Sequence, residues 1–107
     1  YRNAENFFEE YDLLITPAAS VPPFKHEEEY PKEIDGIEME NYLKWEAISY
    51  GVTLFGGPAI VIPCGNIDGK MPFGIQLISR KNSDINLLDV AYSLEQKFKG
   101  NCDLELI

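Results

Sequence analysis

Residues suited to metal or redox chemistry are scarce in this sequence of 107 residues. It contains one histidine, His26, and two cysteines, Cys64 and Cys102, which share no C-x-x-C spacing and have no histidine nearby. Structural zinc sites need four such ligands, so the sequence predicts neither a metal centre nor a bound cofactor. Cys64 ends an apolar run, which favours a small buried side chain over a nucleophile.

Long apolar runs and basic clusters are also missing. No run approaches the roughly 18 apolar residues that cross a bilayer, and no basic stretch followed by an apolar core opens the sequence. Asp and Glu number 18 against 9 Lys and Arg, for a net charge of −9. Such an acidic chain repels phosphate backbones. We therefore expect a soluble, cytoplasmic protein that binds neither nucleic acid nor a membrane.

Hydrophobic residues, in contrast, make up 45% of the sequence, which is too many for a disordered chain. The length corresponds to about one domain, and a compact domain of this size buries roughly 65% of its unfolded surface. No interior domain boundary is visible, so residues 1–107 are interpreted as one segment. Because the sequence begins with Tyr1 rather than Met, we expect a processed product or part of a longer protein.

Hydrophobic spacing predicts alternating helices and short strands. We expect a helix up to about Tyr11, a buried strand at LLIT (13–16), a long loop over 17–37, an amphipathic helix over 38–50, strands over 59–63 and 73–79, and a helix over 84–99. Asp68 and Gly69 are a strong hairpin signal, so the strands over 59–63 and 73–79 should pair antiparallel. This alternation predicts an α/β architecture with a mixed sheet flanked by helices.

The stretch GGPAIVIPCG (56–65) is typical of a fully buried strand, yet it contains no group that could carry out a reaction. It occurs in a series of motifs that spans residues 7–98: YDLLITPA, IDG, Tyr-x-x-Trp, GGPAIVIPCG, DGKMPFGIQLIS and LLDVAYSLEQ. The order of these motifs resembles the C-terminal segment of amidase signature enzymes. The resemblance implies the C-terminal part of the amidase signature fold, and hydrolysis of carboxylic amides to an acid and ammonia or an amine.

The catalytic residues that the resemblance implies are not in this sequence. The family uses a Ser-cis-Ser-Lys triad, with a lysine well upstream and serines in a Gly-Gly-Ser-Ser stretch. No two serines are adjacent here, and none has glycine-rich surroundings. The run Ser79, Arg80, Lys81 is predicted to be a strand terminus at the surface. We therefore expect no catalytic residue in this chain and no activity of the chain alone.

What remains for this segment is scaffold and part of the pocket for a small amide substrate. The resemblance implies that the loop after LLITP and the helix bearing Trp45 approach the acyl group, with Trp45, Thr53 and Phe55 as substrate-binding candidates. Aromatic residues at this spacing also suit a core. The strands expected at LLIT, AIVIP and FGIQLIS are apolar on both faces, and about three helices cannot cover both faces of the sheet. We therefore expect association with a missing N-terminal portion or a homo-oligomer.

Two other interpretations stay open. The missing triad suits a non-catalytic, acidic interaction module with an amidase-like half-fold. The motif order also suits one component of a tRNA-dependent amidotransferase, although IDG and Tyr-x-x-Trp look more like the general amidases.

Overall fold

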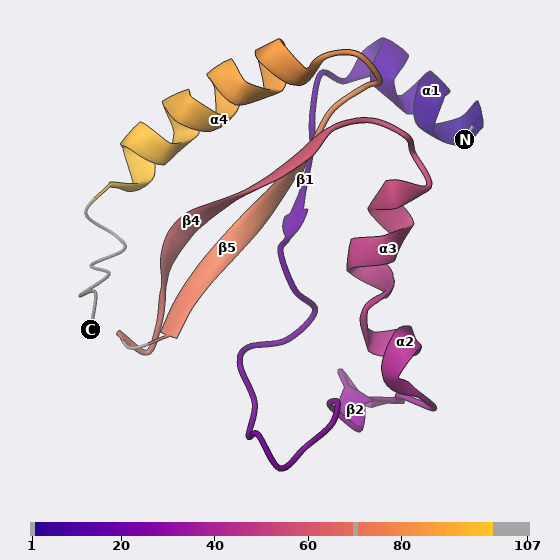
Figure 1. Ribbon diagram of the computed structural model, residues 1–107, viewed down its shortest axis with the longest axis vertical. Coiled ribbons are helices and arrows are strands. Elements are labelled where there is room, and N and C mark those ends of the chain that lie inside the picture. Colours follow the sequence, from indigo (N-terminus) through magenta and orange to yellow (C-terminus); the bar gives the residue numbers. More distant parts are fainter. Residues whose placement is uncertain (1, 70, 100–107) are drawn as a thin grey trace.

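A computed structural model describes residues 2–69 and 71–99. Its elements, in chain order, are α1 (Arg2–Glu10), β1 (Leu14–Pro17), β2 (Glu33–Ile34), β3 (Ile37–Glu38), α2 (Tyr42–Trp45), α3 (Ala47–Thr53), β4 (Ala59–Ile67), β5 (Met71–Ile78) and α4 (Asp84–Phe98). Figure 1 shows α4 along one side of the β4–β5 ribbon and α2 with α3 on the other side. The arrangement confirms an α/β fold with a small sheet flanked by helices.

The hairpin predicted from Asp68 and Gly69 is confirmed. Strands β4 and β5 pair antiparallel from Ala59 opposite Ile78 to Ile67 opposite Met71, with an irregularity after Pro63. Asp68 and Gly69 have φ angles of 50° and 70°. Aspartate and glycine tolerate positive φ better than most residues, so the Asp-Gly pair lets the chain reverse between the paired residues Ile67 and Met71.

The sheet has the order β1-β5-β4, and its pairings in the described residues are antiparallel. The prediction of a mixed sheet was therefore wrong for this part of the chain. The hairpin forces β4 to run opposite to β5, and β1 also enters antiparallel to β5, with Leu14 opposite Ile78. Strands β1 and β4 share a direction, but β5 lies between them and separates them.

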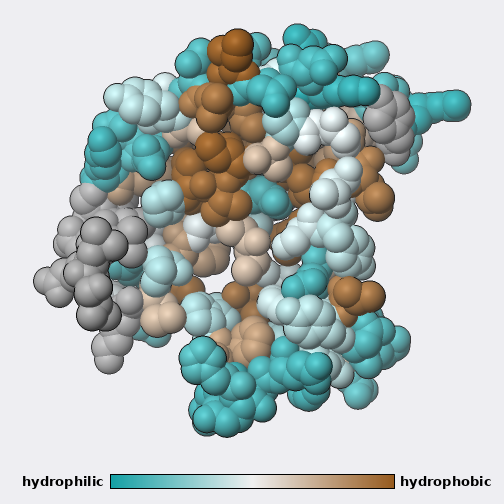
Figure 2. Space-filling model, viewed as in Figure 1, coloured by the Kyte–Doolittle hydropathy of each residue, from teal (hydrophilic) through white to brown (hydrophobic). Residues whose placement is uncertain are grey.

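One face of the sheet packs against α4. The buried core consists of Ile62 and Leu77 from the sheet and Leu87 and Ala91 from α4. These helix residues are four positions apart and so lie on one face of α4. Figure 2 shows hydrophobic side chains gathered in the region of α4 and β4, whereas the end of the molecule formed by the loop and β2 is hydrophilic.

The opposite face of the sheet is covered only in part. Val61 lies on that face and is 55% exposed. Ile15 on the edge strand β1 is opposite Leu77 and so lies on the α4 face, yet it is 52% exposed. The prediction that LLIT and GGPAIVIPCG form fully buried strands was wrong. Successive side chains in a strand point to opposite faces, and α4 covers only one face, which leaves Val61 exposed. Ile15 is exposed on the covered face because β1 is an edge strand.

Two other segments differ from the sequence prediction. The helix expected over 38–50 is divided into α2 and α3, which are separated at Glu46. It starts later than expected because Asn41 caps α2, accepting hydrogen bonds from the amides of Leu43 and Lys44. The loop expected over 17–37 contains the short β2–β3 hairpin, whose turn places Asp35 at φ 50°. That turn repeats the Asp-Gly signal of the main hairpin.

The two terminal helices agree with prediction. Helix α1 ends at Glu10, and α4 begins at Asp84 after Ser83 and ends at Phe98. Gly100, predicted to follow the last helix as its C-terminal cap, lies outside the described residues. Of the helices that the structure describes, none has the length and apolar character needed to span a bilayer.

Candidate functional site

An apolar cavity lies between the loop after β1 and the helix α2. Its volume is about 290 Å³. The described residues that line it are Ala18, Ala19, Val21, Pro22, Pro23, Phe24, Trp45, Pro72, Phe73 and Gly74. They come from three segments far apart in the sequence: the loop after β1, the end of α2, and the start of β5.

Two contacts hold the loop against α2. The Ser20 hydroxyl donates a hydrogen bond of 2.8 Å to the backbone carbonyl of Trp45. The rings of Phe24 and Trp45 meet edge to face, with centroids 5.6 Å apart and an angle of 87° between their planes. Aromatic pairs in this geometry stabilise by about 0.5–1.5 kcal/mol beyond the area they bury. The loop after β1 is thus held against α2 at Trp45 by one hydrogen bond and one aromatic contact.

Gly74 brings the same loop close to the sheet. The Ala18 amide donates a hydrogen bond of 3.0 Å to the Gly74 carbonyl. A Cβ atom on Gly74 would lie 3.0 Å from a Val61 methyl group and 3.5 Å from the Ala18 Cβ atom. The tight contacts of such a Cβ atom are thus with β4, at Val61 and at the Ile62 carbonyl 3.2 Å away, whereas the distance to Ala18 is an ordinary contact. Gly74 also forms part of the cavity wall.

Further aromatic rings extend from Trp45 away from the cavity. Tyr42 contacts the Trp45 ring edge to face at 6.0 Å and the Tyr30 ring at 6.4 Å. The Lys32 ammonium lies 3.5 Å from the centre of the Tyr30 ring. The negative charge of Glu46, together with its hydrogen bond, raises the pKa of the Tyr42 hydroxyl above its ordinary value. Tyr42 is thus kept protonated beside a carboxylate.

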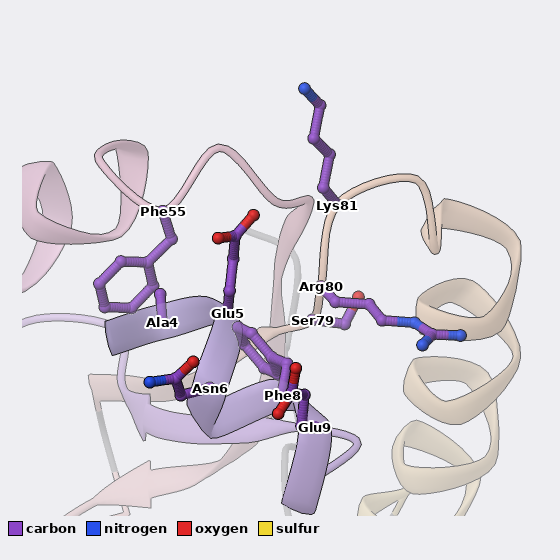
Figure 3. A pocket seen from close by; sticks show the side chains of 9 residues that line it. All are labelled: Ala4, Glu5, Asn6, Phe8, Glu9, Phe55, Ser79, Arg80 and Lys81. Atoms are coloured by element: carbon purple, nitrogen blue, oxygen red, sulfur yellow. The ribbon is translucent and has the colours of Figure 1, made fainter. Parts of the chain in front are cut away.

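A second cavity, of about 470 Å³, lies between α1, Phe55 and the segment after β5 (Figure 3). Its wall contains two carboxylates, of Glu5 and Glu9, and two cations, of Arg80 and Lys81. Figure 3 shows the Lys81 side chain pointing away from the helix. Within residues 2–69 and 71–99, the ion pair that forms is Lys44 with Glu40, at 3.3 Å. The charges around the second cavity therefore stay solvated.

Ser79 lines this second cavity but has no arrangement suited to nucleophilic catalysis. Its hydroxyl lies 2.5 Å from that of Ser83, which in turn donates to the Arg80 carbonyl at 2.5 Å. Ser79 is only 3% exposed, so the prediction of a surface position was wrong. The two serines close the turn between β5 and α4, and this pairing explains the burial.

The three predicted substrate-binding residues are not brought together. Trp45 lines the apolar cavity and Phe55 lines the charged one. Thr53 is exposed, and its hydroxyl donates to the carbonyl of Tyr50 in the preceding turn of α3. Phe24, the aromatic partner of Trp45, was not predicted from the sequence. An aromatic residue directly after Pro22 and Pro23 was the signal available.

Neither Cys64 nor the acidic residues form a reactive or metal-binding cluster in the described part of the chain. Cys64 is half-buried, and its thiol donates to the Phe73 carbonyl at 3.5 Å. In the part of the chain that the structure describes, no three or more His, Cys, Asp or Glu side chains lie close enough together to hold a metal ion.

Comparison with known proteins identifies the family. The family model described as Amidase matches residues 1–88. The chain belongs to the amidase family. Its relatives include a glutamyl-tRNA(Gln) amidotransferase subunit of Alkaliphilus metalliredigens, 41% identical over 90 residues, which are 84% of this chain and 17% of that protein. The corresponding glutamyl-tRNA(Gln) amidotransferase subunit of Geobacillus thermodenitrificans is 38% identical over 95 residues, or 89% of this chain and 18% of that protein.

This amidase-family chain therefore spans less than a fifth of the length of the curated relatives that it matches. No solved structure gives a significant match to it.

Proposed function

We propose that this chain is the C-terminal portion of an enzyme that cleaves small carboxylic amides, and that it supplies scaffold and part of the acyl pocket. The observation that carries the proposal is the apolar cavity at Trp45. It lies where the loop after β1 meets α2, in a chain whose family match includes both segments. Trp45 is the substrate-binding candidate that this cavity supports.

In this proposal the reactive groups come from the rest of the protein. A serine oxygen attacks the amide carbonyl carbon, the C–N bond breaks, and the nitrogen leaves with a proton as ammonia or an amine. Water then hydrolyses the acyl ester, and backbone N–H groups stabilise the oxyanion in both steps. Four of the five serines in the described residues hold structural hydrogen bonds: the hydroxyls of Ser20, Ser79, Ser83 and Ser93 bond to backbone carbonyls or to one another.

A second candidate is one component of a glutamyl-tRNA amidotransferase, in which the released nitrogen is transferred to the acylated tRNA. The names of the relatives favour it. In both candidates the chain works with other protein segments or subunits in the cytoplasm, which supply the reactive groups.

The experiment that tests the proposal uses the natural protein that carries this sequence. Ammonia release is measured from benzamide, isobutyramide and glutamine, with and without glutamyl-tRNA. Release from the simple amides without tRNA is the expected result. Release from glutamine alone, stimulated by glutamyl-tRNA, would favour the second candidate, and no release from any amide would overturn both.

A further inference from the structure

We infer that the apolar cavity selects an uncharged, apolar acyl group of about the size of a benzoyl group and discriminates against acyl groups that carry a charge, such as the acyl group of glutamine. This inference rests on the proposed function, because it assigns the substrate class of the same site. Three features of the cavity carry it: the chemistry of the wall, the orientation of its tryptophan, and its size.

The wall offers little to a charged or strongly polar ligand. None of the described residues that line the cavity has a charged side chain. Three of them, Pro22, Pro23 and Pro72, also lack a backbone N–H. An ammonium or carboxylate group placed here would lose its water without gaining a counter-charge, which is unfavourable. An apolar group loses nothing by the same transfer.

Trp45 is the wall residue with a side-chain N–H, and that group is not accessible to solvent, including from the cavity. The indole nitrogen is buried from solvent and has no hydrogen-bond partner in the described part of the chain. Because water cannot reach the N–H, Trp45 presents its ring atoms to the open space. The ring faces of Trp45 and Phe24 suit a flat apolar group, since aromatic rings prefer edge-to-face and offset contacts.

The neighbouring acidic residue does not change this conclusion. Glu46 follows Trp45 in the chain, but it is not among the residues that line the cavity. Its carboxylate accepts a hydrogen bond from the Tyr42 hydroxyl, on the side of Trp45 where the aromatic contacts continue away from the cavity. A cationic ligand in the cavity would therefore find this carboxylate already engaged.

The size and stiffness of the cavity fit a small ring. An apolar cavity of about 150 Å³ is sufficient to hold benzene. The cavity here, of about 290 Å³, leaves room for a ring or a branched chain together with the attached carbonyl. Prolines fix their own φ angles, so the wall is ordered before the ligand arrives, and less conformational entropy is lost on binding.

Fluorescence provides the test, because Trp45 is the one tryptophan of the sequence. The full chain is titrated with benzamide, isobutyramide and glutamine while the emission of Trp45 is recorded. We expect saturable changes with the first two amides, and a Kd for glutamine at least tenfold higher than that for benzamide. Saturation-transfer NMR on the ring protons of benzamide reports the same binding without relying on the indole.

Two matched variants locate the site. Ala19 is exposed and lines the cavity, so Ala19→Asp adds a charge to the wall without disturbing the core. It should raise the Kd for benzamide at least tenfold. Ala47→Asp, at an exposed position at the start of α3 and outside the lining, should leave that Kd within twofold.

The outcomes separate this inference from the proposed function. Glutamine binding as tightly as benzamide, no saturation with benzamide, or an unchanged Kd in Ala19→Asp would each overturn the inference. None of these measurements requires turnover. Loss of amide cleavage in the natural protein, with the selectivity of binding intact, would overturn the proposed function alone.

Discussion

The α-carbon of Gly57 lies directly against the carbonyl oxygen of Ser79, so that a Cβ atom at residue 57 would overlap this oxygen. The contact is reinforced next to it, where the Ser79 amide donates a hydrogen bond of 3.1 Å to the Pro58 carbonyl. Here the beginning of β4 crosses the end of β5, just before the chain turns into α4. Only glycine allows the two backbones to approach this closely.

Gly57→Ala is therefore expected to lower the free energy of unfolding by about 1–3 kcal/mol, since the β4–β5 crossing must open to admit the methyl group. Gly51 is the matched control: it lies in α3 with nothing near its added Cβ. Gly51→Ala should stabilise by about 0.5–1 kcal/mol, because alanine favours a helix over glycine. Urea unfolding of both variants decides the matter. Equal stability of Gly57→Ala and the parent chain would show that the crossing is looser than described.

Gln76 is expected to link α3 to the sheet. It is 8% exposed, and its amide group donates to the Thr16 hydroxyl at 3.1 Å and to the Ile48 carbonyl at 3.4 Å. Gln76→Ala should destabilise by about 1–3 kcal/mol, because the Ile48 carbonyl loses its side-chain donor in a partly buried site. Hydrogen exchange within α3 should accelerate.

Thr16→Val provides the comparison for that prediction, since it removes one partner of Gln76 and keeps the bond to Ile48. We expect the exchange rates in α3 to stay close to those of the parent chain. If both variants accelerate exchange in α3 equally, the hydrogen bond from Gln76 to the Ile48 carbonyl is not what stabilises α3 against the sheet.

Tyr42 makes stability depend on pH in the alkaline range. Glu46 raises its pKa in the folded state, because the carboxylate repels the phenolate and accepts the hydroxyl proton. An unperturbed tyrosine titrates near pH 10, so this contribution to stability is complete below about pH 10 and is lost as the pH rises through the higher folded-state value. Glu46→Gln should return the pKa of Tyr42 towards its ordinary value.

An ultraviolet titration, with Tyr42→Phe subtracted to isolate one of the six tyrosines, measures that pKa. Glu29, the weaker of the two acidic influences on Tyr42, is the control, and Glu29→Gln should shift the pKa less than Glu46→Gln does. A larger shift of the Tyr42 pKa from Glu29→Gln would contradict the assignment of the effect to Glu46.

The chain alone is expected to hydrolyse no amide above background. Loss of a catalytic nucleophile costs on the order of a millionfold in rate. Four of the five described serines hold structural hydrogen bonds, and no two serines are adjacent in the sequence. The purified chain is assayed against aliphatic and aryl amides. Turnover that a serine-directed phosphonate abolishes would show that a nucleophile was overlooked.

The isolated chain is also expected to self-associate through the sheet face opposite α4. Val61 is exposed on that face. Pairing through the edges is less favourable, because Pro17 and Pro63 lie on the two edge strands with no N–H to donate. Val61→Lys should therefore weaken association at micromolar concentration, as measured by sedimentation velocity. Pro63→Ala, which adds an edge N–H, should not weaken it. A sharp monomer of the parent chain would favour an independent interaction module.

The sequence by itself determined the features that depend on neighbouring residues. Positive φ angles at Asp68 and Gly69 set the main hairpin and with it the pairing of β4 and β5. The spacing of Leu87 and Ala91 determined the buried face of α4. The order of motifs was sufficient for the family. The hairpin and helix signals each lie within a few residues, where local backbone preference and side-chain periodicity dominate.

Only the tertiary structure decided which strand faces are covered and which side chains share a cavity. Val61 reads as a core residue in the sequence, but its burial depends on a layer that α4 does not supply. Phe24 and Trp45 meet because the Ser20 hydroxyl and the Gly74 backbone fasten the loop between them. Thr53 and Phe55 are near Trp45 in sequence but lie outside the apolar cavity. Helix α2 ends before Glu46 and a new helix, α3, begins after it. Such contacts join residues distant along the chain, and no local periodicity encodes them.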